Sequence, residues 1–149
     1  MDEFITLYYG EQAVDTIKDL IQGYEEHTLN LMSQKSFSYN CFETALYSYE
    51  NQPLNLHLSM LENLNDCIEK YEVSAIANKE FYIENLKEVK LTPLFTILMN
   101  STYYFMGDEQ AKGYYVNEFF NLCNELGVKQ YGENLTIQSL KSTYAAYIK

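Results

Sequence analysis

Apolar residues recur every three or four positions along most of this 149-residue chain, and this spacing predicts α-helices rather than strands. Two predicted helices within residues 92–127 carry apolar side chains on more than one side, whereas a surface helix carries a single apolar stripe. We therefore expect this helical pair to form the centre of the core, with Leu98 and Leu122 buried.

Residues that favour helix ends mark the limits of this pair. Thr92 is a favourable N-cap, and Pro93 suits the first helical position, where its missing N–H is not needed. After a tight turn, Asp108 can cap the second helix, and Gly127 can end it in the left-handed conformation. Residues 88–91 are expected to link the pair to the preceding helix.

The same spacing predicts further helices on both sides of the pair. They cover residues 3–32, 37–50, 53–71, about 74–88 and 135–148. Gly10 leaves open whether the first segment is one helix or two, because glycine weakens a helix interior by about 1 kcal/mol relative to alanine. The prediction is an all-α fold: one domain over residues 1–149, built as a compact bundle or helical-hairpin array of six to eight helices.

The composition is typical of a folded protein. Hydrophobic residues make up 47% and aromatic residues 15%, which exceeds what disordered chains carry. No run of 18 apolar residues predicts a membrane span, and the acidic N-terminus lacks the basic region of a signal peptide. We expect a cytoplasmic protein, of a cell or of a virus or other element inside one.

Charge is distributed unevenly along the chain. Its 21 acidic residues face 10 lysines and no arginine, and residues 1–72 carry a net charge of −10 of the total of −11. Binding to nucleic acid or to anionic membranes is disfavoured, since phosphate groups bind positive side chains. We expect a basic protein partner; the alternative is an acidic surface that only maintains solubility.

Two rows of acidic residues have the three- and four-residue spacing that aligns side chains on one face of a helix. The rows are Glu11, Asp15, Asp19 and Glu26, followed by Glu62, Asp66 and Glu69. We predict that both rows are exposed and bind or steer a cationic partner.

Tyrosine is abundant, at 15 of 149 residues. Neighbouring tyrosines on a helix point about 100° apart, so one of each adjacent pair is expected near the surface. Because tyrosine is enriched in binding interfaces, Tyr103, Tyr104 and Tyr114 are candidate partner-binding residues. An AT-rich coding sequence is the alternative, and it also explains the lack of arginine and tryptophan.

No catalytic or metal-binding pattern stands out. His27 and His57 lack the four-residue spacing of a zinc-binding helix, and no phosphate-binding loop or nucleophile motif occurs. Glu50 or Glu62 could orient His57 as a base, but no nucleophile accompanies it. We expect structural or surface histidines, and neither a metal nor another cofactor.

The cysteines also argue against redox or metal chemistry. Cys41, Cys67 and Cys123 are far apart and form no CxxC motif. Each lies on or beside the apolar face of a predicted helix, so buried, unreactive thiols are expected.

Residues 101–127, STYYFMGDEQAKGYYVNEFFNLCNELG, resemble one tetratricopeptide-type helical hairpin. The resemblance rests on the adjacent tyrosines, Gly107, Ala111 and Tyr115. Counted over the whole hairpin of residues 92–127 it covers about a quarter of the chain, and Ala111 is one position from the usual register. It implies a helical adaptor or a peptide sensor, as in peptide-sensing regulators of Gram-positive bacteria and their phages. An ordinary αα-hairpin explains the same residues.

Together these patterns predict a non-enzymatic protein-binding module. We expect an acidic inhibitor, immunity-type or anti-defence protein that covers a basic surface of another protein. The alternatives are a helical adaptor or peptide sensor and a viral Bcl-2-like groove that binds an amphipathic helix, with an unrecognised enzyme last. The oligomeric state stays open, a homodimer included.

Overall fold

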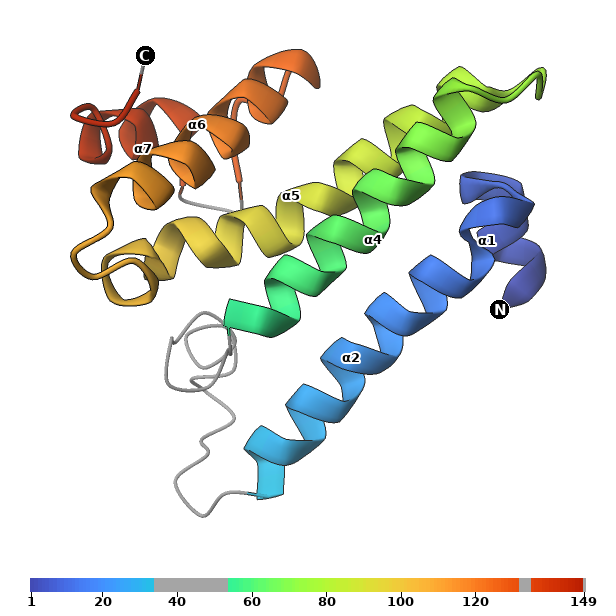
Figure 1. Cartoon of the computed structure of the whole chain (residues 1–149), viewed down its shortest axis with the longest axis horizontal. Coiled ribbons are helices and arrows are strands. Elements are labelled where there is room, and N and C mark those ends of the chain that lie inside the picture. The colour runs from blue at the N-terminus through green and yellow to red at the C-terminus, as the bar shows by residue number, and fades with distance from the viewer. Residues whose placement is uncertain (34–53, 132–134, 149) are drawn as a thin grey trace.

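The computed structural model describes residues 1–33, 54–131 and 135–148, and the fold is all-α, as predicted. The helix expected over residues 37–50 lies outside the described residues. The described helices are α1 (Asp2–Tyr9), the short 3₁₀ helix η1 (Glu11–Ala13), α2 (Val14–Ser33), α4 (Leu54–Glu72), α5 (Lys79–Tyr104), α6 (Glu109–Glu125) and α7 (Ile137–Thr143) (Figure 1).

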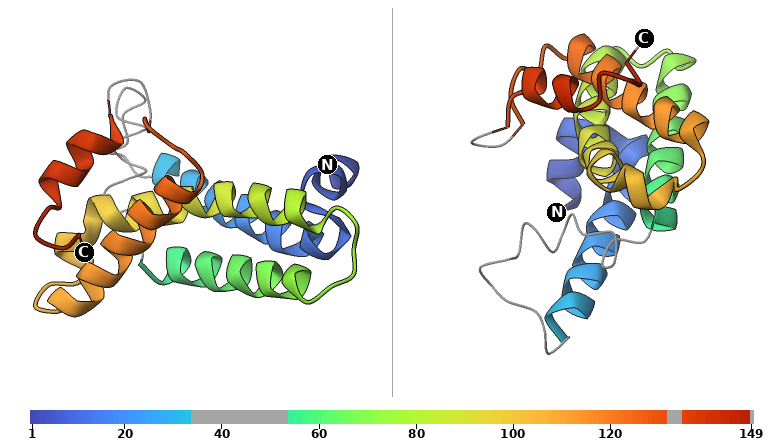
Figure 2. Two further views of the ribbon diagram at one scale, coloured as in Figure 1. Left: turned by 90° about the horizontal axis from the view of Figure 1, so that it is seen from above. Right: turned by 90° about the vertical axis from the view of Figure 1, so that its left-hand side faces the viewer.

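The long helix α5 lies at the centre of this arrangement. It contains 26 residues, and its length is therefore about 39 Å at 1.5 Å per residue. Helix α4 runs antiparallel beside its first half, whereas α6 and α7 lie at its other end (Figure 2). Helix α2 packs against α4, and α1 packs against the beginning of α5.

The predicted helix start at Thr92 and Pro93 is wrong, as is the predicted linker over residues 88–91. α5 passes through Pro93 without interruption, and the helix expected over residues 74–88 is its first part, beginning at Lys79. An internal proline removes one backbone hydrogen bond and costs about 3 kcal/mol or more. Burial of several large apolar side chains around it, each contributing about 1.5–3 kcal/mol, outweighs that cost.

Two clusters of buried side chains hold the helices together. The N-terminal cluster joins α1, η1, α2 and α4 through Ile5, Ala13, Ile17, Leu64, Cys67, Ile68 and Tyr71, with Leu86 of α5. The C-terminal cluster joins the rest of α5 to α6 and α7 and includes Leu98, Phe119, Phe120 and Leu122, with Leu61 of α4. Since α5 contributes to both, it connects the two ends of the fold.

The first predicted segment forms two helices, separated at Gly10. This glycine has φ of 80°, a left-handed conformation that other residues rarely adopt. The buried Tyr71 hydroxyl accepts a hydrogen bond from the Gln12 N–H at 3.1 Å, and it lies so near Gly10 that a Cβ atom there would overlap it.

The predicted caps around α6 are confirmed. The Asp108 side chain accepts a hydrogen bond from the Ala111 N–H at 2.9 Å, and Gly127 follows the helix with φ of 68°. The last helix is shorter than expected: α7 covers Ile137–Thr143 rather than residues 135–148. Thr136 caps its beginning by accepting a hydrogen bond from the Ser139 N–H at 3.1 Å. None of the described helices is long and apolar enough to cross a membrane.

Replacing Leu98 with alanine tests the position of the core. The side chain is 0% exposed, so Leu98→Ala should lower the free energy of unfolding by about 2–5 kcal/mol in urea titrations. The matched control is Met99→Ala, at a neighbouring position that is 43% exposed. This substitution should lower the free energy of unfolding by less than about 0.5 kcal/mol. Equal losses in the two variants would contradict this description of α5.

Gly10 and Gly107, two of the three glycines with positive φ, differ in how closely other atoms surround them. Gly107→Ala meets no atom within 4 Å, so it should cost only the left-handed backbone penalty of about 1–2 kcal/mol. Gly10→Ala should cost more, because φ of 80° with ψ of 163° is a conformation that essentially only glycine adopts, and the new Cβ atom also displaces Tyr71; its unfolding midpoint in urea should therefore fall further. Identical midpoints would show that the Tyr71 contact does not constrain the α1–α2 junction.

Candidate functional site

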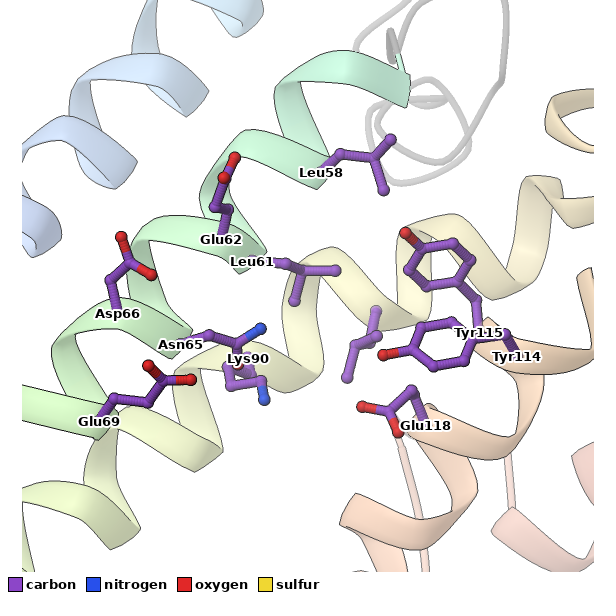
Figure 3. A pocket seen from close by; sticks show the side chains of 11 residues that line it. Leu58, Leu61, Glu62, Asn65, Asp66, Glu69, Lys90, Tyr114, Tyr115 and Glu118 are labelled. Atoms are coloured by element: carbon purple, nitrogen blue, oxygen red, sulfur yellow. The ribbon is translucent and has the colours of Figure 1, made fainter. Parts of the chain in front are cut away.

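An open groove of about 420 Å³ lies between α4 and α6, with α5 beneath it (Figure 3). It combines charged, aromatic and aliphatic side chains from three helices. Its lining residues are Leu58, Leu61, Glu62, Asn65, Asp66 and Glu69 of α4, Lys90 and Leu94 of α5, and Tyr114, Tyr115 and Glu118 of α6. Its apolar side chains belong to the C-terminal cluster or pack against it, so the groove lies where that cluster approaches the surface.

The α4 wall of the groove is acidic. Glu62, Asp66 and Glu69 are exposed and follow one another at spacings of four and three residues, which aligns them along one face of the helix. Leu58 and Leu61 lie next to this row and are more buried. The amphipathic pattern of α4 thus places a row of carboxylates along an apolar floor.

The α6 wall carries two tyrosines and one further carboxylate. The rings of Tyr114 and Tyr115 meet edge to face at 5.0 Å, and Tyr115 also stacks on Phe105 at 5.2 Å, which restrains both rings. Their hydroxyls point toward the groove in Figure 3. Burial and the nearby Glu118 raise the pKa of Tyr114. Its hydroxyl therefore stays protonated and able to donate at neutral pH.

Among the described residues that line the groove, Lys90 of α5 is the one that is basic. It is half-buried, and burial lowers the pKa of its ammonium group; Lys87 also lowers this pKa, whereas Glu118 and Glu125 raise it. Four carboxylates and one ammonium group thus surround the same space.

The structure brings together four of the ten residues predicted to bind a partner, namely Glu62, Asp66, Glu69 and Tyr114. The other acidic row is exposed on η1 and α2 but does not line the groove: Glu11 of η1, and Asp15, Asp19 and Glu26 of α2. α2 turns its buried side toward α4, and this row lies on the opposite side of the helix.

The remaining two candidates lie at the end of α5, outside the groove lining. Tyr103 is exposed, as expected for an interface residue. Tyr104 is half-buried and packs against the C-terminal cluster, and burial raises its pKa to about 12. Tyr104 therefore belongs to the edge of the core rather than to an open surface.

Sequence reasoning missed Lys90, Tyr115 and Glu118. Glu118 lies one helical turn after Tyr114, so the spacing alone could have indicated it. Lys90 lies one turn before Leu94, but this relation exists only if the helix continues through Pro93, which the sequence did not predict.

His57 is buried within the fold. It is 0% exposed, its ring lies 6.0 Å from that of Tyr24, and among the described residues neither ring nitrogen has a hydrogen-bond partner. Burial, and secondarily His27, lowers its pKa to about 4. The suggested pairing of His57 with Glu62 is thus not formed, and Glu50 lies outside the described residues.

Two of the three cysteines are buried as expected, whereas Cys41 lies outside the described residues. Cys67 packs in the N-terminal cluster and Cys123 in the C-terminal cluster. Burial raises the pKa of both thiols, to about 11 for Cys123, so they are weak nucleophiles at neutral pH.

Comparisons with protein-family models, curated proteins and solved structures give no match. The end of α5 and the whole of α6 form a helical hairpin around Gly107. Both the tetratricopeptide-type resemblance and an ordinary αα-hairpin predict this hairpin, so it does not distinguish between them.

The buried His57 predicts an acid-sensitive fold. The unfolded chain binds a proton near pH 6.5, whereas the folded chain binds it only near pH 4, so protonation between these values favours unfolding. The contribution of His57 to the free energy of unfolding is complete above pH 6.5 and should fall by about 3 kcal/mol toward pH 4.

Urea titrations of the wild type and His57→Met across this pH range measure the effect. The variant should lose this part of the pH dependence whatever its stability at pH 7. If the free energy of unfolding changes with pH in the same way in both proteins, this pH dependence does not come from His57.

Proposed function

We propose that the protein is a non-enzymatic binding module whose groove captures a basic segment of another protein. The observation that carries the proposal is the row of three carboxylates along a groove that also has an apolar floor and two tyrosine rings. By covering a basic surface, such a module acts as an inhibitor, immunity-type or anti-defence protein in the cytoplasm of a microbial or infected cell.

The side chains of lysine and arginine suit this mixed surface. Their charged ends can pair with Glu62, Asp66 and Glu69, while their long aliphatic stems pack on Leu58 and the neighbouring apolar side chains. Exposed tyrosine rings add a favourable face for a cation, and Tyr114 is 59% exposed. Charge, shape and aromatic content thus favour the same class of ligand.

The size of the groove limits what it can hold. A volume of about 420 Å³ is at the lower end of the range of about 300–1,000 Å³ typical of small-ligand pockets. It therefore accommodates a few side chains of a partner, and the rest of the contact must spread over the adjoining surface. The net charge of −11 supports long-range attraction of a basic partner.

An apolar amphipathic helix is the second candidate ligand, because Leu58, Leu61 and Leu94 all line the groove. The two ligand classes differ in their response to salt. Screening weakens the binding of a basic ligand, whereas burial of apolar surface changes little between low and moderate salt.

A charge-neutralising triple variant tests the proposal. Glu62→Gln, Asp66→Asn and Glu69→Gln should slow association with a lysine-rich helical peptide by about tenfold or more at low salt, since electrostatic steering contributes about 10–10³-fold. The chain contains no tryptophan, so a single tryptophan in the peptide reports binding by stopped-flow fluorescence without background.

The acidic row of η1 and α2 supplies the matched control. Glu11→Gln, Asp15→Asn and Asp19→Asn remove the same charge from exposed positions outside the groove and should slow association much less. Melting temperatures of both variants should stay near that of the wild type, because exposed charges contribute little to stability. Equal slowing in both would assign the attraction to net charge alone and contradict a role for the groove.

A further inference from the structure

The outer face of α1 is apolar and exposed. Ile5 packs into the N-terminal cluster, whereas Phe4 is 57% exposed and Leu7 is 68% exposed. Tyr8, four residues after Phe4, is also exposed, and so is Phe81 in the first turn of α5. These four exposed side chains form the α1 patch. A surface helix usually turns polar side chains outward, and a contiguous apolar patch marks an interaction surface.

The α1 patch is held in place by contacts between the two helices. The ring of Tyr8 lies 4.6 Å from that of Phe4 and 6.4 Å from that of Phe81. The Asn85 side-chain amide donates a hydrogen bond to the Tyr8 carbonyl oxygen at 2.6 Å, which joins α5 to the end of α1. A surface restrained in this way loses little conformational freedom when a ligand binds.

The α1 patch is separate from the groove. None of its four side chains lines the groove, and α1 lies at the end of the molecule opposite α6 and α7 (Figure 1). The two surfaces can therefore be tested one without the other.

Unpaired acidic residues border the α1 patch. Those next to its side chains in the sequence or one helical turn away are exposed: Glu3, Glu80 and Glu84. In the described part of the chain, none of the three belongs to an ion pair closer than 4.0 Å. Lys79 does not neutralise them, because its ammonium group donates to the carbonyl oxygens of Glu72 and Ser74. The border of the patch is therefore negative, which favours a basic partner and disfavours anionic lipid.

The area of the α1 patch and its charge both argue against a second copy of this chain. The four side chains expose on the order of 400 Å², since a large aromatic side chain buries about 150–250 Å² when fully covered. A stable protein interface buries about 800 Å² per partner, twice as much. A second copy would also bring the same three carboxylates against this border.

We propose that the α1 patch binds an amphipathic helix of another protein, whose apolar stripe is flanked by lysine or arginine. Phe4, Leu7 and Tyr8 have the three- and four-residue spacing that forms a ridge along a helix, and such a ridge packs against a second helix. The apolar stripe of the ligand covers this ridge and Phe81, while its basic side chains meet the acidic border. This surface is additional to the groove and does not depend on it.

Three helical peptides, each with one tryptophan, test the proposal. The first has a leucine stripe flanked by lysines, the second has the same stripe flanked by glutamates, and the third has the composition of the first with its leucines scattered around the helix. At low salt the wild type should bind the first about tenfold more tightly than either of the others. The first and third carry equal charge, so attraction to the net negative charge is common to both.

A double variant of α1 shows whether the patch is the binding site. Phe4→Gln with Leu7→Gln should weaken binding of the first peptide by about tenfold or more, because two exposed anchors are lost. The matched control is Leu29→Gln with Met106→Gln, which changes two exposed apolar residues outside the patch and should bind as the wild type does. Thermal melts establish that both variants are folded.

Phe81→Gln probes the same patch from α5. It should weaken binding of the first peptide in the same direction while leaving the α1 sequence unchanged. Unchanged affinity in both this variant and the α1 double variant would overturn the proposal.

Two other occupants of the α1 patch would also overturn it. One is a second copy, shown by a wild-type dimer in sedimentation equilibrium that the α1 double variant dissociates. The other is lipid, shown by binding to phosphatidylcholine vesicles that the same variant abolishes.

The groove variant separates this proposal from the proposed function. If the triple variant of Glu62, Asp66 and Glu69 loses the first peptide while the α1 double variant keeps it, the helix lies in the groove and the α1 patch is not its site. If only the α1 double variant loses this peptide, and the groove variant also binds the lysine-rich peptide as the wild type does, the α1 patch stands and the groove proposal fails.

Discussion

The burial of residues 93–98 of α5 on all sides is the constraint from which the architecture follows. Residues 93–98 are buried without interruption, so no face of this part of the helix can be left to solvent. Helix α4 covers mainly the first half of α5, and α6 with α7 covers the second. Because α4 and α6 are separate helices, they leave part of the surface of α5 open between them. The groove is this open space (Figure 3).

The side chains that stabilise α4 differ from those that we propose to bind a partner. On α4, Leu64 and Ile68 bind the helix into the fold, while Glu62 and Asp66 remain in solvent. Exposed carboxylates of this kind add little to the free energy of folding, so their arrangement can change without loss of the core. A groove that depends on such residues can be adapted to a partner at small structural cost.

Local chemistry explains what the sequence predicted correctly. The Asp108 cap, the Gly127 helix end and the amphipathic pattern of α4 each depend on residues within a few positions of one another. Pro93 is different, because the first turn and the interior of a helix require the same φ of proline, and only burial by distant residues decides between them. Because the helix was predicted to begin at Thr92, Lys90 was not recognised as part of it. The placement of α4 and α6 on either side of α5 depends on residues far apart in the sequence, so no local pattern predicts it.

The proline within α5 has a consequence for how the molecule opens. Without an amide hydrogen at Pro93, the backbone hydrogen-bond ladder has a gap close to where the helix passes from the N-terminal to the C-terminal cluster. The two halves of α5 pack against different helices. Amide hydrogen exchange should therefore show that they open as two separate cooperative units rather than as one. A ligand in the groove touches α4 and α6 together, and would merge these units by protecting the amides on both sides of the proline.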